Sequence, residues 1–283
     1  MVKMGFSLQA LPRDLCDQTV RKLYEAGFSA VSPVWSRELP LDELASCAAK
    51  NGMTIQSLHA PHKGIALLWK PKDPASFETV GNITGCIDVC CAYNIPVTVV
   101  HGWQGLIYTF PAEPLDFSNF DCIVDYAEKK GVKIAFENLE GEEYLEALLT
   151  RYSEKAHVGY CWDSGHDNCY PHRTDFLKAY GERLIMTHLN DNLGLRDPLG
   201  VPSGLDDLHF LPFDGNINWE NAVLRLKALP KQEILNFEFK KKSKSSAPKD
   251  LIYENLSMAE YIELAGKRAR LIAELYEKIG GSV

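Results

Sequence analysis

Residues 117–137 read FSNFDCIVDYAEKKGVKIAFE, and this stretch contains the unit that decides the fold. It consists of a predicted helix over Phe117–Lys130, a stop at Gly131 and a predicted apolar strand over Val132–Glu137. Apolar side chains recur at helical spacing in the first part, and glycine commonly follows the last turn of a helix. The same glycine stop precedes an apolar run at Gly27 and at Gly52. A helix leading straight into a buried strand is typical of parallel α/β folds.

The alternation continues along the chain. The predicted strands are Met4–Leu8, Phe28–Val34, Met53–His59, Pro96–His101, Val132–Glu137, His157–Asp163, Leu184–Leu189 and Glu233–Phe239. The predicted helices are Arg13–Ala26, Leu41–Lys50, Ala75–Tyr93, Phe117–Lys130, Glu143–Tyr152, Thr174–Tyr180, Trp219–Leu229 and Ser257–Ile279. Eight strand–helix pairs in about 250 residues favour a parallel (β/α)8 TIM barrel over an open doubly wound sheet. The absence of a Gly-x-Gly-x-x-Gly turn predicts that there is no nucleotide cofactor.

We expect a single domain over residues 1–283, because no linker or change of composition divides the chain. Hydrophobic residues make up 46% and charged residues 24%, which is ordinary for a globular protein. The formal net charge of −8 does not favour binding to nucleic acid or to an anionic membrane. The sequence leaves the oligomeric state open, a homo-oligomer included.

The cytoplasm is the expected compartment. The N-terminal residues do not resemble a signal peptide, and the longest apolar runs are too short to cross a bilayer. The 8 cysteines include no Cys-x-x-Cys pair, so reduced and mostly buried thiols are expected rather than disulfides or a zinc ribbon.

Potential metal ligands stand at the ends of six successive predicted strands. They are His59, His101, Glu137, Asp163, His188 and Glu238. The carboxyl ends of barrel strands converge, and the long predicted loops 60–74, 102–116, 190–218 and 240–255 lie on the same face. A charge at the end of a buried strand is costly unless it is paired or bound to metal. Three carboxylates and a histidine suit Mn²⁺, Mg²⁺, Co²⁺ or Zn²⁺.

Other polar residues lie near these strand ends. His166 follows Asp163 by three positions, and Asp207 and His209 fall in the loop after the seventh strand. Asn138 and the run Asn190-Asp191-Asn192 are either outer ligands of the site or ordinary turn residues. His157 and His172 do not fit the pattern, and we expect them to be structural or surface residues.

Taken together, these residues resemble the xylose isomerase-like barrel superfamily, which includes sugar epimerases, sugar isomerases and endonuclease IV. The matching stretches are Ser57-Leu58-His59-Ala60-Pro61, Val99-Val100-His101-Gly102, Phe136-Glu137-Asn138, Trp162-Asp163-Ser164-Gly165-His166, Thr187-His188-Leu189-Asn190-Asp191, Asp207 to Trp219, and Phe237-Glu238. The resemblance runs from the first strand to the last. No single motif is diagnostic, but the ordered set is specific.

Resemblance to the epimerase branch implies one divalent ion held by Glu137, Asp163, His188 and Glu238. It also implies that Glu137 and Glu238 act as acid and base on opposite faces of a sugar. Proton transfer next to a carbonyl, through a metal-stabilised enediolate, would then interconvert sugars or sugar phosphates. The expected substrate contacts are His59, His101, His166 and, by stacking, Trp103.

The endonuclease branch implies a different enzyme, a three-zinc phosphodiesterase acting on abasic DNA. This chain has a residue of suitable type at each of the nine ligand positions: His59, His101, Glu137, Asp163, His166, His188, Asp207, His209 and Glu238. Asp207 and His209 are therefore candidates for additional metal ligands. The sequence departs from that branch at Pro61-His62-Lys63-Gly64 and at Gly102-Trp103. A barrel that binds sugar without catalysis is a third alternative.

Lysines cluster directly after the last predicted strand, in Lys240-Lys241-Lys242-Ser243-Lys244. One interpretation is a solvated loop. The other is a cationic lid over an anionic substrate, since phosphate sites of barrels often use the last two loops.

Overall fold

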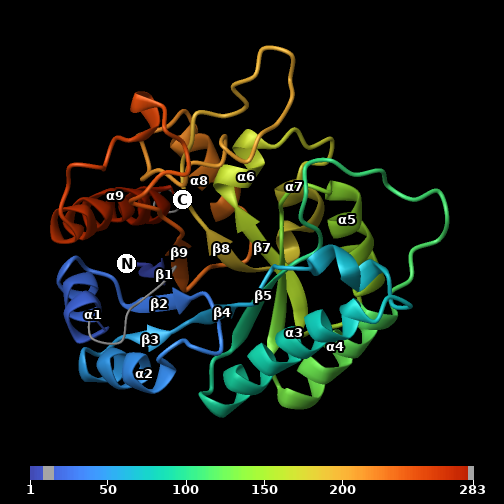
Figure 1. Ribbon diagram of the computed structural model, residues 1–283. Coiled ribbons are helices and arrows are strands. Elements are labelled where there is room, and N and C mark those ends of the chain that lie inside the picture. Colours follow the sequence, from blue (N-terminus) through green and yellow to red (C-terminus); the bar gives the residue numbers. More distant parts are fainter. Residues whose placement is uncertain (9–15, 280–283) are drawn as a thin grey trace.

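Parallel strands form the centre of the computed structural model, which describes residues 1–8 and 16–279 (Figure 1). The strands are β1 (Lys3–Leu8), β2 (Ala30–Pro33), β3 (Thr54–Ile55), β4 (Ser57–His59), β5 (Val97–His101), β6 (Lys133–Glu137), β7 (Val158–Asp163), β8 (Leu184–His188) and β9 (Ile234–Phe237). Each lies within a predicted strand except β1, which begins one residue earlier, at Lys3. The third predicted strand is broken at Gln56 into β3 and β4, because β3 pairs with β2 whereas β4 pairs with β5.

The strands form two sheets, in the orders β3-β2-β1-β9 and β4-β5-β6-β7-β8. Isolated parallel bridges join the sheets at both seams, from Val34 to His59 and from Leu189 to Phe237. At the second seam, Thr187 Oγ1 donates to the carbonyl of Asn236 at 3.2 Å and accepts its N–H at 3.0 Å. These contacts close the ring of strands, and the predicted (β/α)8 barrel is confirmed.

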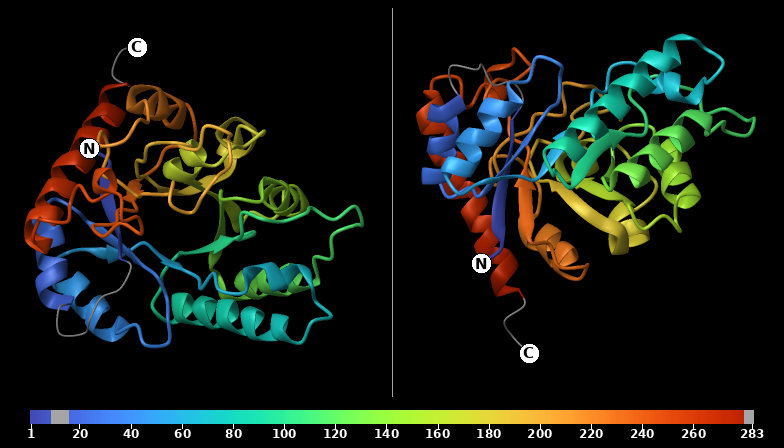
Figure 2. Two further views of the ribbon diagram at one scale, coloured as in Figure 1. Left: turned by 45° about the horizontal axis from the view of Figure 1, so that its top comes forward. Right: turned by 90° about the horizontal axis from the view of Figure 1, so that it is seen from below.

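Helices surround the strands, as Figures 1 and 2 show. They are α1 (Cys16–Glu25), α2 (Leu41–Lys50), α3 (Ala75–Ala92), α4 (Ser118–Lys130), α5 (Glu142–Arg151), α6 (Ser164–Cys169), α7 (Phe176–Tyr180), α8 (Trp219–Lys227) and α9 (Met258–Lys278), with short 3-10 turns at Ile65–Trp69, Gly181–Arg183 and Pro248–Asp250. The predicted start at Arg13 lies outside the described residues. The short helix α6 lies between the predicted strand that ends at Asp163 and the predicted helix that begins at Thr174, where the sequence predicts a loop.

Local signals explain where helices begin and end. α4 ends at Gly131, whose φ of 69° is in the left-handed region that glycine adopts without strain. α9 begins with a capping box, in which Ser257 accepts the backbone N–H of Glu260 and the Glu260 side chain accepts the N–H of Ser257. No helix in the described part of the chain is both long and apolar enough to cross a membrane.

Candidate metal centre

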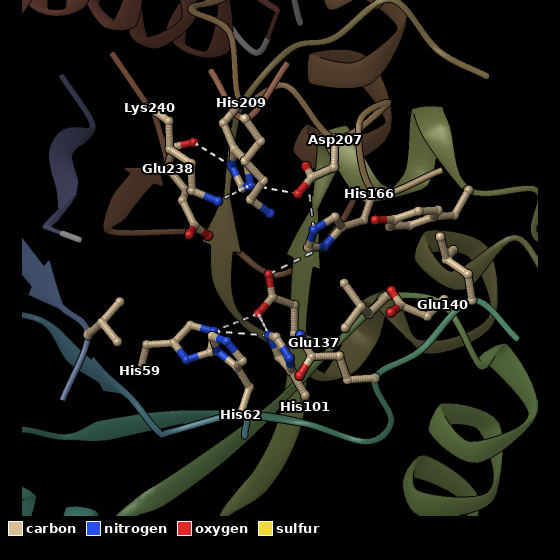
Figure 3. Close-up of a pocket in the computed structure, with 17 residues that line it drawn as sticks. His59, His62, His101, Glu137, Glu140, His166, Asp207, His209, Glu238 and Lys240 are labelled. Atoms are coloured by element: carbon tan, nitrogen blue, oxygen red, sulfur yellow. Dashed lines mark hydrogen bonds and ion pairs between the residues drawn. The ribbon is translucent and has the colours of Figure 1, made fainter. Parts of the chain in front are cut away.

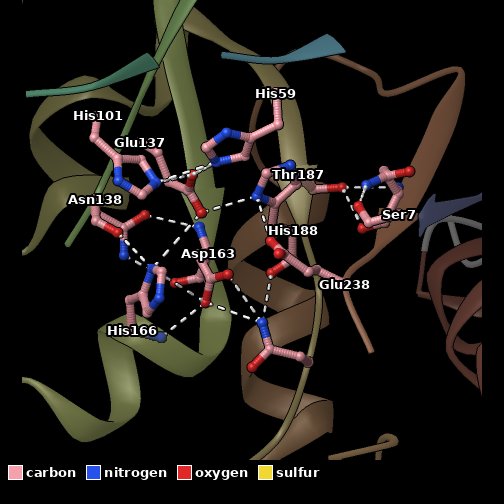
Figure 4. Close-up of polar contacts among 12 residues, drawn as sticks. Ser7, His59, His101, Glu137, Asn138, Asp163, His166, Thr187, His188 and Glu238 are labelled. Atoms are coloured by element: carbon pink, nitrogen blue, oxygen red, sulfur yellow. Dashed lines mark hydrogen bonds and ion pairs between the residues drawn. The ribbon is translucent and has the colours of Figure 1, made fainter. Parts of the chain in front are cut away.

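Four predicted site residues meet where the carboxyl ends of the strands converge (Figure 4). Glu137, Asp163 and His188 end β6, β7 and β8, and Glu238 directly follows β9. One ligand atom from each residue lies within 4.8 Å of those of the other three, and all four residues are buried. The barrel thus brings together side chains that are far apart in the sequence.

The imidazole of His188 lies between two of the carboxylates. Its Nδ1 atom is 2.8 Å from Glu137 Oε1 and 2.8 Å from Glu238 Oε2. One ring nitrogen offers at most one proton, so it can donate a full hydrogen bond to only one of these oxygens. Asp163 adds a third buried carboxylate to the same group. Buried charges of like sign are costly without compensation, and a divalent cation between these ligands would supply it.

Neighbouring polar groups orient Asp163. Asn190 Nδ2 donates to both carboxylate oxygens of Asp163, at 3.1 and 2.9 Å. The Asp163 carboxylate also caps α6, because its Oδ1 accepts the backbone N–H of His166 at 2.7 Å. Asn138 donates to the backbone carbonyl of Asp163 at 2.8 Å and accepts its N–H at 2.7 Å. Metal ligands are commonly held by outer hydrogen bonds of this kind.

The pKa values of these carboxylates are shifted in opposite directions. Burial alone raises the pKa of Glu137, but the charge of His188 and hydrogen bonds from histidines outweigh it and hold the pKa well below its ordinary value. Burial likewise raises the pKa of Glu238, and His188 again lowers it well below the ordinary value. At Asp163 burial dominates and raises the pKa to about 6. Such shifts are frequent at functional sites.

A second group of ligand atoms shares Glu137. His59 Nε2 and His101 Nε2 each lie 3.2 Å from Glu137 Oε2 and 3.1 Å from one another. The Nδ1 atom of His59 is 2.8 Å from the carbonyl oxygen of Ala60. Because a carbonyl only accepts, Nδ1 carries the proton and Nε2 of the neutral ring presents a lone pair to the group. Burial lowers the pKa of His101 to about 4, which favours its neutral, metal-ligating form.

A third group consists of His166, Asp207 and His209, whose ligand atoms also lie within 4.8 Å of one another. His209 Nε2 is 2.9 Å from Asp207 Oδ2, and His166 Nε2 is 3.7 Å from Asp207 Oδ1. The Nδ1 atom of His166 is 2.9 Å from the carbonyl oxygen of Asn138, and that of His209 is 3.1 Å from the carbonyl oxygen of Glu238. Both rings therefore direct Nε2 toward the aspartate.

The donor sets of these groups fit divalent cations. Each combines imidazole nitrogens with carboxylate oxygens in buried surroundings, which suits Zn²⁺, Co²⁺ or Mn²⁺, and the carboxylate-rich group around Asp163 also suits Mg²⁺. Negative charge is in excess locally: burial lowers the pKa of His166, yet Asp163 and Asp207 raise it to about 10. The Oδ1 atom of Asp207 is buried without a hydrogen-bond partner. A cation would supply the missing partner.

A cavity of about 190 Å³ opens beside these groups (Figure 3). Its lining includes seven predicted site residues, namely His59, His101, Glu137, His166, Asp207, His209 and Glu238. Other polar groups line it as well: His62, Gln104, Glu140, Tyr170, Lys240 and Lys244. Asp163 and His188 are not part of the lining. The cavity therefore exposes only part of the ligand cluster to a small molecule.

Trp103 does not line this cavity, although we expected it to stack on a substrate. Its ring stacks on Tyr144, with the centroids 4.4 Å apart and the planes 5° apart. Gly141 packs directly against the indole ring, because a Cβ atom at residue 141 would lie 2.6 Å from it. In this structure Trp103 supports the loop after β5.

The structure also distinguishes two roles, an outer partner of the site or an ordinary loop residue, for the polar residues that follow strand ends. Asn138 and Asn190 hydrogen-bond to Asp163 and therefore position a ligand. Asp191 instead braces the loop that follows it, accepting the indole N–H of Trp219 at 2.8 Å and the backbone N–H of Ile217 at 3.1 Å. Their place directly after strand ends was the only sequence signal, and it does not separate the two roles.

Solved structures share this fold over nearly the whole chain. A D-tagatose 3-epimerase-like protein is 21% identical, with a TM-score of 0.67 and coverage of 98% of both chains. An L-ribulose 3-epimerase is 15% identical, with a TM-score of 0.72 over 99% of this chain and 96% of that chain. IolI, a protein solved with a bound zinc atom, is 14% identical, with a TM-score of 0.65 over 99% of this chain and 100% of that one.

Two relatives were found by sequence. The uncharacterized protein y4fM of Sinorhizobium fredii is 37% identical over 133 residues, which span 44% of this chain and 39% of that protein's length. The uncharacterized protein MJ1311 of Methanocaldococcus jannaschii is 26% identical over 233 residues, which span 75% of this chain and 71% of that protein. The model of one protein family, the xylose isomerase-like TIM barrel, matches residues 20–261. Because this match includes β2 to β9 and every candidate ligand described above, the chain belongs to the xylose isomerase-like TIM barrel family.

Proposed function

We propose that this protein is a divalent-metal-dependent sugar isomerase or epimerase. The observation that carries the proposal is the buried group of Glu137, Asp163, His188 and Glu238 beside a small polar cavity, into which only the two glutamates of this group open. Two proteins of similar fold, a D-tagatose 3-epimerase-like protein and an L-ribulose 3-epimerase, support a carbohydrate substrate. The zinc atom bound by IolI supports a metal in this type of barrel.

The two glutamates are placed to move protons. Glu137 and Glu238 belong to strands separated around the barrel by β7 and β8, so they reach the cavity from different sides. A glutamate acts as a base when it is ionised and as an acid when it carries a proton, and epimerisation requires one of each at the start of a turnover. When bound, the ion would polarise the oxygens of a hydroxyketone and acidify the adjacent C–H bond. One glutamate removes that proton. Delivery of a proton by the second, protonated glutamate to the opposite face epimerises the carbon and leaves the first glutamate protonated. Return of the proton by the first glutamate to the neighbouring carbonyl carbon, together with transfer of the hydroxyl proton to the neighbouring oxygen, isomerises the sugar.

The test is hydrogen exchange in deuterium oxide. Metal-loaded protein is incubated with a panel of ketoses and inositol-type ketones, and loss of the C–H signal is followed by proton NMR. We expect exchange with at least one compound, and Glu137→Gln and Glu238→Gln should each slow it by at least about 10²-fold, the effect of losing general acid–base catalysis. Glu140→Gln is the matched control, since Glu140 lines the cavity outside the ligand groups. Exchange that persists in both catalytic variants would contradict the mechanism.

A second candidate, a three-metal phosphodiesterase, is favoured by one observation. The groups His59–His101–Glu137 and His166–Asp207–His209 offer ligands for two further ions, and Glu137 directs Oε2 to one group and Oε1 to His188. Two measurements separate the candidates. One ion per chain and exchange of a ketose proton support the sugar enzyme, whereas three zinc ions per chain and catalytic nicking of abasic duplex DNA would replace it with a nuclease.

A further inference from the structure

The segment after β9 carries four lysines that do not face the same way. Lys240 and Lys244 line the cavity beside the metal ligands. Lys241 instead donates from Nζ to the backbone carbonyl of Glu254 at 3.3 Å. Lys242 and Lys244 are both exposed, but Lys242 is not part of the lining. Two of the four lysines therefore border the cavity and two do not.

Contacts with His209 hold the start of this segment in place. The backbone N–H of Lys240 donates to the carbonyl of His209 at 3.1 Å, and its ammonium group contacts His209 Nε2. At the other end Ser245 is buried, and its Oγ accepts the N–H of Ala247 at 3.1 Å within the same loop. The fold therefore sets the position of Lys240, and Lys244 directly precedes a buried residue.

The cavity wall carries charges of both signs. Figure 3 shows Lys240 beside His209 and Glu238, on the opposite side of the cavity from Glu140. Glu140 is engaged there, because its Oε1 accepts the backbone N–H of Gly105 at 2.6 Å. Lys244 has no carboxylate partner among the described residues. An unpaired ammonium group at the edge of a partly enclosed cavity is a binding group for an anion that comes from outside the chain.

The two lysines border a cavity that is shared with other polar groups. His62, from the loop after β4, is part of the same lining as Lys240 and Lys244. At about 190 Å³, the space suits a small molecule rather than a polymer.

We propose that Lys240 and Lys244 bind the anionic group of the substrate, so that the protein acts on a sugar carrying a phosphate or a carboxylate and not on a neutral sugar. The proposal rests on the proposed function for the sugar part of the ligand. The metal ligands would hold the hydroxyketone end, and the two lysines would hold the charged end. Phosphate and carboxylate share the chemistry that these lysines recognise, and the experiment separates them.

The test compares three ketohexoses that differ at C6: fructose, fructose 6-phosphate and fructuronate, with inorganic phosphate as a fourth probe. Binding to the metal-loaded protein is measured by titration calorimetry. We expect at least one anionic sugar to bind about tenfold more tightly than fructose, which corresponds to one charge-assisted contact. Preference for fructose 6-phosphate assigns a phosphate, and preference for fructuronate assigns a carboxylate.

Variants of the same loop connect the preference to the lysines. Lys244→Gln should remove most of the tenfold preference and leave fructose binding unchanged, whereas Lys242→Gln, in the exposed matched position, should keep it. Phosphate should compete with the preferred anionic sugar in wild type and more weakly in Lys244→Gln. Equal binding of all three sugars, no binding of any anion, or equal losses in both variants would overturn the proposal. Calorimetry requires no turnover, so an anion preference without proton exchange would reject the isomerase function and leave the lysine site standing.

Discussion

Glu137 is the residue on which the candidate site depends most. Its Oε1 contacts His188, and its Oε2 contacts His59 and His101, so one carboxylate belongs to two ligand groups. Both oxygens of an ionised carboxylate accept hydrogen bonds or metal coordination. An amide of the same shape keeps only one such oxygen.

The substitution Glu137→Gln should therefore weaken metal binding. We expect at least a tenfold loss of affinity, measured as metal content after dialysis against buffers of fixed free metal concentration. Chelator treatment should lower the Tm of the wild type, because an ion that binds only the folded state stabilises it, and should lower the Tm of Glu137→Gln much less. Glu128→Gln is the control, since Glu128 is exposed and pairs with Lys155. Equal metal content in Glu137→Gln and wild type would show that Glu137 is no ligand.

At the scale of elements, Arg196 joins two loops that carry site residues. Its Nη1 donates to both oxygens of Asp250, at 3.0 and 2.8 Å, and its Nε donates to Asp206 Oδ1 at 2.8 Å. Asp206 directly precedes the candidate ligand Asp207, and Asp250 lies just beyond the lysine segment. Both aspartates are buried. Removing the arginine would leave two buried carboxylates without their cation.

Arg196→Gln should lower the free energy of unfolding at pH 7 by about 3 kcal/mol, the cost of breaking a buried ion pair. Burial raises the pKa of Asp250, but its bonds to Ser245 and Arg196 lower it below the ordinary value of 3.8. A lowered pKa stabilises the fold above pH 3.8, and the effect is lost as pH falls through the folded-state pKa. The difference in unfolding free energy between variant and wild type should therefore be smaller at pH 3.5 than at pH 7.

Urea unfolding at pH 7 and pH 3.5 measures both effects. Arg225→Gln provides the control, because Arg225 pairs with the half-exposed Asp175 and such pairs contribute about 0–1 kcal/mol. A gap that is the same at both pH values would mean that Arg196 acts through packing and not through the charge of Asp250.

At the scale of the whole molecule, the barrel closes through a side chain. Between β8 and β9, Thr187 Oγ1 accepts the backbone N–H of Asn236 and donates to its carbonyl oxygen. Just past the end of β8, backbone hydrogen bonds join the two segments directly. The N–H of Leu189 donates to the carbonyl of Asn236 at 2.9 Å, and the N–H of Glu238 donates to the carbonyl of Leu189 at 3.1 Å. Glu238 and His188 stand on the two sides of this seam, so its closure sets the distance between two candidate ligands.

Thr187→Val keeps the shape of the side chain and removes the hydroxyl. The buried backbone N–H of Asn236 loses its partner, whereas its carbonyl keeps the N–H of Leu189. We therefore expect a loss of about 1–3 kcal/mol in unfolding free energy. The amide hydrogen of Asn236 should also exchange faster with solvent, as NMR would show. Thr98→Val is the matched control on another strand, since Thr98 is also buried and, among the described residues, its Oγ1 contacts Cys86 Sγ of α3 alone, at 3.5 Å. Unchanged exchange at Asn236 would mean that the seam does not need the hydroxyl.

Local sequence determined the order of strands and helices, because hydrophobic period and glycine stops depend only on neighbours in the chain. The stretch around Gly131, for example, specifies a helix that ends there and a strand that ends at Glu137, and it does so without contacts from distant parts of the chain. The grouping of the candidate ligands could be predicted for the same reason, since each stands at the end of an apolar run and the carboxyl ends of parallel strands meet in a closed barrel.

Only the tertiary structure decided how side chains outside that pattern are used. Gln56 divides one predicted strand because its neighbours pair with different strands, Trp103 packs on Tyr144 instead of lining the cavity, and Lys244 faces the cavity while Lys241 turns away. These outcomes depend on contacts between segments far apart in the sequence, and no local period encodes such contacts. The barrel could therefore be predicted from the chain alone, whereas the lining of its cavity could not.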